Sequence, residues 1–326
     1  MYQAFVLAAG LGTRLRPLTE QVPKPLVPVC GVPLLAYSLA LAARHGLRDV
    51  VVNAHWLAPQ VEAWAGEREG CRVTVVTEPE LLGTGGGLAA VGDRMAPRFV
   101  VLNADVLHGV DLGALLAAVP EGGAAMALRP DPDPDTLGAR YGIVAADAAG
   151  RVARLTTVAA ADPVGALDET THFTGIHALD RAALALVPPG PQCIVRTAYR
   201  ALVPQRRVAG VRYDGIWLDA GDPAAYLDAN LAVLDLPDRS ILGLDPFPRA
   251  GYARTADGVE HGDRALVDGV TVTGPVWVGQ GARIRRGAAL HRCVVGAGAD
   301  VAGNLRECVV WDGAAATGDH LRLTMI

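Results

Sequence analysis

Residues 4–19 read AFVLAAGLGTRLRPLT, an apolar run that leads into a glycine-rich loop with two arginines. The run from 4 to 9 is unbroken, as in a strand that is buried on both faces of a sheet. Gly10 and Gly12 let backbone amides approach a phosphate closely. A dinucleotide-binding fingerprint would need a third glycine where Leu15 stands, and a P-loop would need a Gly-Lys-Ser/Thr sequence. The stretch therefore predicts a strand followed by a phosphate-binding loop of another type.

Apolar runs alternate with helical patterns through the first half of the chain. Runs rich in β-branched residues lie at 50–53, 73–77 and 99–103, and helical patterns lie at 34–45, 57–64 and 88–91. Alternation of strands and helices is typical of a parallel sheet that helices cover. We expect an α/β fold with a doubly wound, mostly parallel, Rossmann-like sheet that binds its ligands at the carboxyl ends of the strands.

The pattern changes after residue 130. Residues 131–135 read DPDPD and predict a loop, because proline disrupts both helices and β-ladders. Residues 141–157 predict a hairpin that turns at Ala149-Gly150. Residues 223–234 predict a helix with Asp222 as its N-cap and a proline at its first position.

An apolar residue recurs every six positions near the C-terminus. Val278, Ile284 and Leu290 keep this spacing, and Val295 and Val301 repeat it after a slip of one residue. Glycines occupy the turns between them. This period is the signature of a β-helix in which each hexad forms one side of a coil. Ordinary short strands of a small β-domain are the alternative.

The composition is that of a folded protein with a large core. The chain has 326 residues, of which 51% are hydrophobic and 19% charged, and this length favours two domains over one. The net charge of −5 lacks the basic surplus of a nucleic-acid binder. The five cysteines show no CxxC spacing and are odd in number, which favours neither a zinc site nor a disulfide framework. With no pattern of a secretory signal or a membrane span, we expect a cytoplasmic protein without nucleic-acid or membrane partners.

A lysine between two prolines follows the glycine-rich loop. Residues 23–29 read PKPLVPV, and Pro23 and Pro25 restrict the backbone on both sides of Lys24. A rigidly presented cation suits an anionic ligand, whereas a lysine alone is ordinarily a solvated surface residue.

Five ordered segments together resemble the signature of the sugar-1-phosphate nucleotidyltransferases, also called NDP-sugar pyrophosphorylases. They are the loop at 10–19, PKPLVPV at 23–29, GVPLL at 31–35, Asn103-Ala104-Asp105, and WLDAGDP at 217–223. The resemblance implies a nucleotidyltransferase catalytic domain at 1–235. A linker or irregular extension at 236–266 would follow. The last part would be a hexapeptide-repeat-like left-handed β-helix at 267–326, which many members of the family carry.

The resemblance implies that a sugar 1-phosphate oxygen attacks the α-phosphorus of an NTP and releases pyrophosphate. Catalysis of such a reaction consists mainly of charge neutralisation and alignment. The implied catalytic residues are Arg14, Lys24, Asp105 and Asp219. Asp105 and Asp219 would hold one Mg²⁺, which prefers carboxylate and phosphate oxygens. Arg14 would bind the pyrophosphate end of the NTP, and Lys24 would contact the reacting phosphates.

A second glycine-rich segment, ELLGTGGG at 80–87, resembles the family's base-recognition segment. The implied nucleotide-binding residues are Ala8, Gly10, Leu11, Gly12 and Thr13 of the loop, with Glu80, Gly83, Thr84 and Gly85 of this segment. Gly85 and Gly86 would open space for the base. Glu78 and Glu80 could accept the N–H donors of guanine, and the segment has no glutamine of the kind that many uridylyl- and thymidylyltransferases carry. This favours guanine, with an exposed glutamate of no such role as the alternative.

The sugar contacts implied by the resemblance are Asn103, Gly142, Glu169, Thr174, Gly175 and Arg196. The chain departs from the family at Thr156-Thr157-Val158, where a Glu-Lys-Pro motif usually stands. The lysine that would help to hold the sugar phosphate is therefore missing, and Arg196 is the candidate replacement. Uridylyltransferases that act on N-acetylmuramic acid 1-phosphate lack the motif too.

The resemblance thus favours a Mg²⁺-dependent transfer of a guanylyl group from GTP to mannose 1-phosphate. The alternatives are a uridylyltransferase for glucose 1-phosphate or N-acetylmuramic acid 1-phosphate, a heptose 1-phosphate guanylyltransferase, and a noncatalytic paralogue that binds nucleotide sugars. For the hexad region we expect a role in homo-oligomerisation or capping. An acetyltransferase is less favoured, because His291 is the only candidate catalytic histidine in that region.

Overall fold

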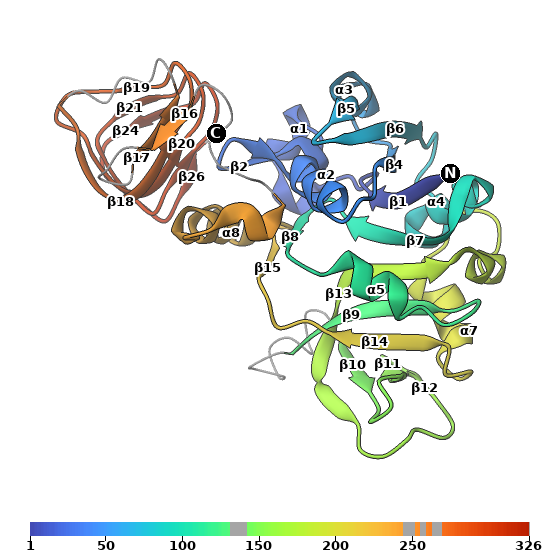
Figure 1. Cartoon of the computed structure of the whole chain (residues 1–326). Coiled ribbons are helices and arrows are strands. Elements are labelled where there is room, and N and C mark those ends of the chain that lie inside the picture. The colour runs from blue at the N-terminus through green and yellow to red at the C-terminus, as the bar shows by residue number, and fades with distance from the viewer. Residues whose placement is uncertain (131–141, 244–251, 255–258, 263–268, 326) are drawn as a thin grey trace. The chain divides into compact units, whose positions relative to one another are not determined.

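The computed structural model describes residues 1–130, 142–243, 252–254, 259–262 and 269–325 (Figure 1). The chain forms two compact units, each made of segments that lie far apart in the sequence. The first unit comprises Met1–Leu11, Ser38–Ala104 and His108–Trp217. The second comprises Gly12–Tyr37, Asp105–Leu107 and Leu218–Ile326. The loop at 131–135 and residue 141 of the expected hairpin lie outside the described residues.

A mixed sheet of eleven described strands forms the first unit. The strand order is β12-β11-β10-β13-β7-β1-β4-β6-β5, and β9 joins β13 and carries β14. The strands are β1 (Tyr2–Leu7), β4 (Asp49–Ala54), β5 (Gly66–Arg68), β6 (Cys71–Thr77), β7 (Met95–Asn103), β9 (Ala124–Pro130), β10 (Ile143–Ala146), β11 (Val152–Leu155), β12 (Val158–Ala159), β13 (Asp168–Asp180) and β14 (Val208–Arg212).

The centre of this sheet confirms the expected fold class. Strands β7, β1, β4 and β6 run parallel, with Val6 opposite Val52 and Leu102. The apolar runs of β1, β4 and β7 are buried at their centres because both faces of the sheet are covered there. Leu88 of α4 and Tyr199 of η5 belong to the same buried cluster as Phe5. Antiparallel strands, among them β13, extend this parallel core.

The helices of the described chain are short. They are α1 (Leu18–Gln21), α2 (Leu34–Arg44), α3 (Ala58–Trp64), α4 (Gly83–Val91), α5 (Leu112–Ala117), α7 (Arg200–Leu202) and α8 (Pro223–Asp235). The 3-10 helices are η1 (Thr13–Leu15), η2 (Lys24–Leu26), η3 (Gly92–Arg94), η4 (Arg181–Leu186) and η6 (Arg239–Leu242), and η5 (Val195–Tyr199) is a π-helix.

Two local expectations are confirmed. Strands β10 and β11 form the predicted hairpin, and Gly150 turns it with a φ of 69° and an N–H donated to the Asp147 carbonyl (2.8 Å). Helix α8 begins after Asp222, whose carboxylate accepts the Ala225 N–H at 3.0 Å. No helix among the described residues combines the length and the apolar character that crossing a membrane requires.

The second unit contains the segment after the glycine-rich loop, helix α8 and the C-terminal strands. Strands β2 (Pro28–Val29) and β3 (Val32–Pro33) form a small antiparallel pair. Strand β8 (Val106–His108) pairs with β15 (Trp217–Asp219). The C-terminal strands are β16 (Tyr252–Arg254), β17 (Val259–Gly262), β18 (Thr271–Val278), β19 (Arg283–Ile284), β20 (Ala289–Val295), β21 (Asp300–Ala302), β22 (Asn304–Arg306), β23 (Val309–Val310), β24 (Ala315–Thr317), β25 (His320–Leu321) and β26 (Thr324–Met325).

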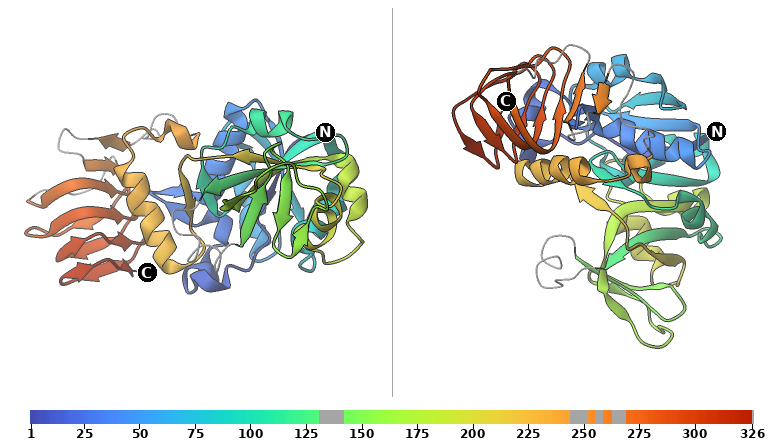
Figure 2. Two further views of the ribbon diagram at one scale, coloured as in Figure 1. Left: turned by 90° about the horizontal axis from the view of Figure 1, so that it is seen from below. Right: turned by 60° about the vertical axis from the view of Figure 1, so that its left-hand side comes forward.

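Strands β18 to β26, which we call the C-terminal stack, pair in parallel and are consistent with a β-helix (Figure 2). All five apolar residues of the six-residue pattern lie in the buried core of this stack. Gly279 and Gly296 allow neighbouring coils to meet, because a Cβ at either position would come within 2.5 Å of the next coil's backbone nitrogen. Strands β16 and β17 extend the stack into the region expected to be a linker.

Candidate active site

The glycine-rich loop leaves the end of strand β1. The backbone N–H of Ala8 donates to Oδ1 of Asn53 at 2.7 Å, so the loop is tied to the end of β4. Gly10 and Leu11 are exposed. The loop therefore begins on a rigid support and then presents its backbone to solvent.

The loop continues into the second unit at Gly12. Gly12 has a φ of 63°, and its carbonyl accepts the hydroxyl of Thr19 at 2.8 Å. A Cβ at Gly12 would lie 2.8 Å from the Thr19 methyl carbon, so both the backbone conformation and the space require glycine. The turn leads directly into η1, which carries Thr13 and the exposed Arg14.

Lys24 and Asp105 contact each other although 81 positions separate them in the sequence. Lys24 begins helix η2 after the extended Pro23. Its ammonium group donates to Oδ2 of Asp105, and the two side chains are 12% and 26% exposed. The pair is therefore largely shielded but open to solvent on the side of the carboxylate.

Asp219 and Arg14 lie beside the same glycine. A Cβ at Gly221 would be 2.7 Å from Oδ1 of Asp219 and 2.9 Å from Nη2 of Arg14. The backbone joins this group to Asp105, because the Ala220 N–H donates to the Asp105 carbonyl at 3.0 Å. All four expected catalytic residues thus come together within the second unit.

Glu78 is a buried carboxylate of the first unit. It is 4% exposed. Its Oε1 accepts the amide N–H of Asn53 at 2.7 Å, and its Oε2 accepts the Leu82 N–H at 3.0 Å. The same Asn53 holds Ala8, so a continuous chain of hydrogen bonds joins the glycine-rich loop to the segment at 78–82. Glu78 therefore supports the loop, and its oxygens are occupied by groups of the protein itself.

Helix α4 begins at Gly83, five residues before the expected start at 88. The glycines permit a close approach of the 190–194 segment, since a Cβ at Gly86 would lie 2.4 Å from the Gly190 carbonyl oxygen. The Gly85 N–H donates to the Gln192 carbonyl at 2.8 Å, and the Thr84 hydroxyl accepts the Ile194 N–H at 3.1 Å. The space beside Gly85 and Gly86 is thus occupied by backbone. Glu80 is exposed and remains the acid that could meet a base.

The expected sugar residues fall into two sets. Gly175, with a φ of 84°, lies against Asn103, because a Cβ there would be 2.3 Å from the Asn103 amide nitrogen. Thr174 is buried, and its hydroxyl donates to the Ala127 carbonyl at 2.9 Å. Trp217 donates its indole N–H to the Thr174 carbonyl at 3.0 Å. Asn103, Thr174, Gly175 and Trp217 are therefore packed together at the middle of β13, where its register with β9 shifts.

The second set of expected sugar residues lies elsewhere in the first unit. Glu169 is exposed and pairs with Arg154 at 3.0 Å. Arg196 is an exposed residue of η5. Gly142 lies next to Thr156, whose methyl carbon would be 3.5 Å from a Cβ at that position. The contacts of these residues do not link them to the group around Thr174, and their binding roles remain predictions.

The histidines that flank the sugar segment are core residues. The His172 ring packs edge-on against Trp217 with centroids 5.3 Å apart. His177 bonds to the hydroxyl of Tyr199. Burial lowers the pKa of His177 to about 3, so this ring is neutral near pH 7. Its role is in packing and hydrogen bonding.

Residues 3–235 match the sequence model of the family described as nucleotidyl transferase. The chain belongs to this family. It is 30% identical over 298 residues to the mannose-1-phosphate guanylyltransferase of Mycobacterium tuberculosis, covering 90% of this chain and 79% of that protein. It is 28% identical over 354 residues to the UTP–glucose-1-phosphate uridylyltransferase of Synechocystis, covering 96% and 90%. The solved structure of HddC from Yersinia pseudotuberculosis has the same fold, with a TM-score of 0.56 at 22% identity over 71% of this chain and 98% of that one.

The comparisons confirm the resemblance to the sugar-1-phosphate nucleotidyltransferases. The chain is a nucleotidyltransferase, and substrates of the nucleotide and sugar-phosphate class are consistent with its family. The two relatives carry the names of different bases and different sugars, so they leave the substrate of this nucleotidyltransferase open.

Sequence reasoning missed Asn53 and Trp217 as parts of the site. Both have a signal that could have pointed to them. Asn53 is a polar residue at the carboxyl end of a predicted core strand, where ligands and loop supports gather in such folds. Trp217 opens the WLDAGDP segment, and a buried indole usually needs an acceptor for its N–H.

Proposed function

We propose that this nucleotidyltransferase moves a guanylyl group from GTP to mannose 1-phosphate and releases pyrophosphate. The observation that carries the proposal is the cluster of Arg14, Lys24, Asp105 and Asp219. A sugar 1-phosphate oxygen bonds to the α-phosphorus while the bond from that phosphorus to the bridging oxygen breaks. Because two anions must approach, the barrier falls mainly through charge neutralisation and alignment.

The two cations of the cluster have distinct tasks in this proposal. The exposed guanidinium of Arg14 binds the pyrophosphate end, since its planar set of donors fits phosphate oxygens. The ammonium of Lys24 moves from Asp105 to the reacting phosphates, and its flexible stem allows this short transfer. The backbone amides of Leu11, Gly12 and Thr13 bind the phosphate chain, following the anion-binding use of such turns.

The two carboxylates suit Mg²⁺. No group of three metal-ligating His, Cys, Asp or Glu side chains occurs in the described part of the chain. An ion at Asp105 and Asp219 would therefore take its other ligands from phosphates and water, which is the pattern that Mg²⁺ prefers. The contact of Lys24 with Asp105 shows that this carboxylate accepts a cation here. The chemistry supplied by the bound ion is neutralisation of charge on the reacting phosphates.

Recognition of the base and sugar rests on the first unit in this proposal. The exposed Glu80 accepts the N–H donors of guanine. Gly83, Thr84 and Gly85 support this segment by packing on the backbone at 192–194. Asn103 and Gly175 offer polar atoms to a sugar, and the buried Thr174 holds this part of β13 through its bond to the Ala127 carbonyl. Gly142, Glu169 and Arg196 complete the predicted sugar contacts, with Arg196 in place of the missing lysine.

A uridylyl transfer to glucose 1-phosphate or N-acetylmuramic acid 1-phosphate is the second candidate. One structural observation favours it over guanylyl transfer. The oxygens of Glu78 are bonded to Asn53 and Leu82, so one of the two acids that favoured guanine is engaged inside the protein. The similarity to the Synechocystis uridylyltransferase over 96% of this chain supports the same alternative.

The proposal is tested by pyrophosphate release with four NTPs against a panel of sugar 1-phosphates, including mannose, glucose, heptose and N-acetylmuramic acid. We expect turnover to be greatest with GTP and mannose 1-phosphate and to stop when EDTA removes divalent metal. Faster turnover with UTP would replace the guanylyl proposal by the uridylyl one. Absence of turnover with every pair, together with tight binding of a nucleotide sugar, would instead identify a noncatalytic paralogue.

A further inference from the structure

Two tryptophans of the C-terminal stack lie outside its core and are nevertheless buried. Val276 and Val278 point into the core, so the alternation of a strand directs Trp277 outward. Trp277 is only 3% exposed and Trp311 only 8%. Large side chains on the outside of the stack must therefore be covered by other parts of the second unit.

The covering groups are the segment after Lys24 and helix α8. The indole of Trp277 packs on Gly31, where a Cβ would lie 2.0 Å from a ring carbon. The indole N–H of Trp311 donates to the hydroxyl of Tyr226 at 3.0 Å. The stack thus contacts both elements through its outer tryptophans.

Helix α8 also forms hydrogen bonds to the backbone at 28–30, in and next to strand β2. The Tyr226 hydroxyl donates to the Pro28 carbonyl at 2.6 Å. Two positions later the Cys30 N–H donates to Oδ1 of Asn230 at 2.8 Å. Tyr226 and Asn230 are almost fully buried, and burial raises the pKa of Tyr226 far above its ordinary value. Buried hydrogen bonds of this kind are costly to leave unmade, so they restrain the backbone at 28–30.

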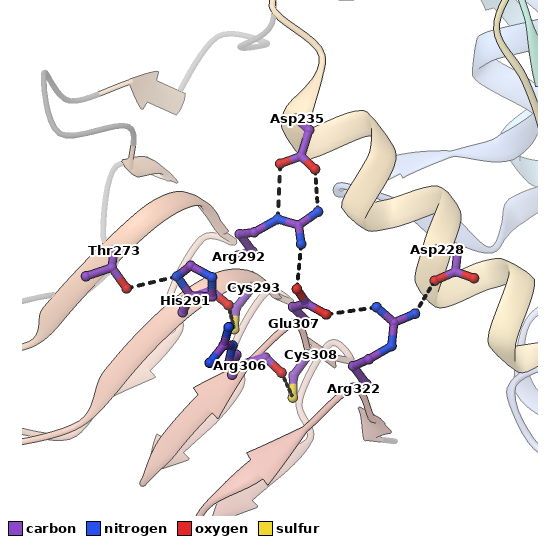
Figure 3. Close-up of polar contacts among 10 residues, drawn as sticks. All are labelled: Asp228, Asp235, Thr273, His291, Arg292, Cys293, Arg306, Glu307, Cys308 and Arg322. Carbon is purple, nitrogen blue, oxygen red and sulfur yellow. Dashed lines mark hydrogen bonds and ion pairs between the residues drawn. The ribbon is translucent and has the colours of Figure 1, made fainter.

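Ion pairs hold α8 and the stack in one register (Figure 3). Arg292, Glu307 and Arg322 are spaced by 15 residues and lie at the same corner of successive coils. Their φ angles are left-handed, at 49°, 54° and 49° respectively. Arg292 binds Asp235 and Arg322 binds Asp228, while Glu307 accepts from both arginines at 2.6 and 2.8 Å. The ladder reaches across two turns of α8, which carries Tyr226 and Asn230.

We propose that the C-terminal stack positions Lys24 for the reaction, with Trp311 and Tyr226 as the positioning residues. The proposal rests on the proposed function, in which Lys24 meets the reacting phosphates. Pro28 is four residues from Lys24, and the backbone between them is held in helix η2 and strand β2. A shift of the backbone at Pro28 therefore displaces the backbone from which the Lys24 side chain reaches the phosphates. The stack lies beyond residue 235, where the family match ends, so this support is added to the catalytic domain from outside it.

Two measurements on Tyr226→Phe and Trp311→Phe test the proposal. Tyr226→Phe removes only the hydroxyl that joins Trp311 to Pro28, whereas Trp311→Phe removes the indole N–H together with part of the ring. We expect faster hydrogen exchange of the backbone amides at 24–31 in both variants. We also expect kcat to fall by about tenfold in Tyr226→Phe with the KM for NTP nearly unchanged, because displaced groups lose interactions made in the transition state.

The control is Asp300→Asn, which breaks the pair of Asp300 with Arg285 in the same stack. Both side chains of this pair are partly exposed, so exchange at 24–31 and kcat should keep their wild-type values. Unchanged exchange at 24–31 in Tyr226→Phe, or faster exchange with an unchanged kcat, would overturn the proposal. A wild-type protein without turnover would end the proposed function, and the exchange measurement would still decide whether the stack restrains the segment.

Discussion

Glu78 and Asp105 both follow strands of the parallel core, but their surroundings differ. Glu78 is 4% exposed, and both of its oxygens accept neutral N–H donors that the fold holds in place. The Asp105 side chain is 26% exposed, and its partner is the flexible cation of Lys24. The oxygens of Glu78 are bonded to groups of the protein. The partner of Asp105 is a lysine that can also bind a phosphate.

Burial and the kind of hydrogen-bonding partner distinguish a structural carboxylate from one that can take part in a reaction. A buried acid with rigid donors stabilises the loop that it holds, and replacing it should change the free energy of unfolding. A partly exposed acid paired with a flexible lysine contributes less to folding, because water can solvate the carboxylate on its open side. Its replacement should change turnover instead.

The largest expected effect is on turnover. Asp105→Ala and Asp219→Ala should each lower kcat by about a thousandfold or more, which equals roughly 4 kcal/mol of transition-state stabilisation. In the proposed function both carboxylates hold a metal ion, and Asp105 also binds Lys24. Steady-state pyrophosphate release measures the effect, and circular dichroism with a melting curve checks the fold. An Asp105→Ala variant with wild-type kcat would refute the role of Asp105.

The second effect is on stability and concerns Asn53. Asn53→Asp replaces the donor to Glu78 by a second carboxylate in a buried place, which should lower the free energy of unfolding by about 3 kcal/mol near pH 7. Urea unfolding measures the loss. Acidification should restore part of the difference from wild type, because a protonated aspartic acid can again donate to Glu78. A variant as stable as wild type at pH 7 would show that the chain of hydrogen bonds contributes nothing.

A milder change at Glu78 sharpens the same point. Glu78→Gln keeps the shape of the side chain and one acceptor oxygen. Its other terminal atom becomes an NH2 group, which faces the N–H donor of either Asn53 or Leu82. We expect a loss of about 1–2 kcal/mol of unfolding free energy, since one buried hydrogen bond is left unmade. Urea unfolding at pH 7 is the measurement. A large fall in kcat with unchanged stability would place Glu78 among the reacting groups and remove the contrast with Asp105.

The smallest effect on stability is expected at Glu80. Glu80→Ala removes an exposed side chain, so the free energy of unfolding should change by less than about 0.5 kcal/mol. If Glu80 accepts the N–H donors of guanine, the ratio of kcat/KM for GTP to that for UTP should fall in this variant. An unchanged ratio would leave the exposed glutamate without a role in base selection.

Much of the fold could be predicted because its signals are local. The unbroken apolar runs of β1, β4 and β7 predict a parallel core, and the six-residue spacing predicts the buried positions of the stack. The start of α4 could not be predicted in this way. Its three consecutive glycines have a low intrinsic tendency to form a helix, and the helix is stabilised by the backbone at 190–194 that packs on them.

In the candidate site, too, some residues could be predicted from the sequence and others could not. The resemblance identified Arg14, Lys24, Asp105 and Asp219, and the structure brings these four together in the second unit. The sequence pattern treated Glu78 and Glu80 alike, because both are acids in one polar segment. Only the position of Asn53, 25 residues away, shows that Glu78 is occupied.

The sequence by itself determined the central parallel strands, the hairpin, helix α8 and the family. These properties depend on residue spacing over a few turns or strands, where backbone geometry leaves few choices. The tertiary structure alone decided which carboxylate is buried and how the C-terminal stack meets the segment after Lys24. The contact of Tyr226 with Pro28 joins residues 198 positions apart, and only the packing of the whole second unit places such groups within hydrogen-bonding distance.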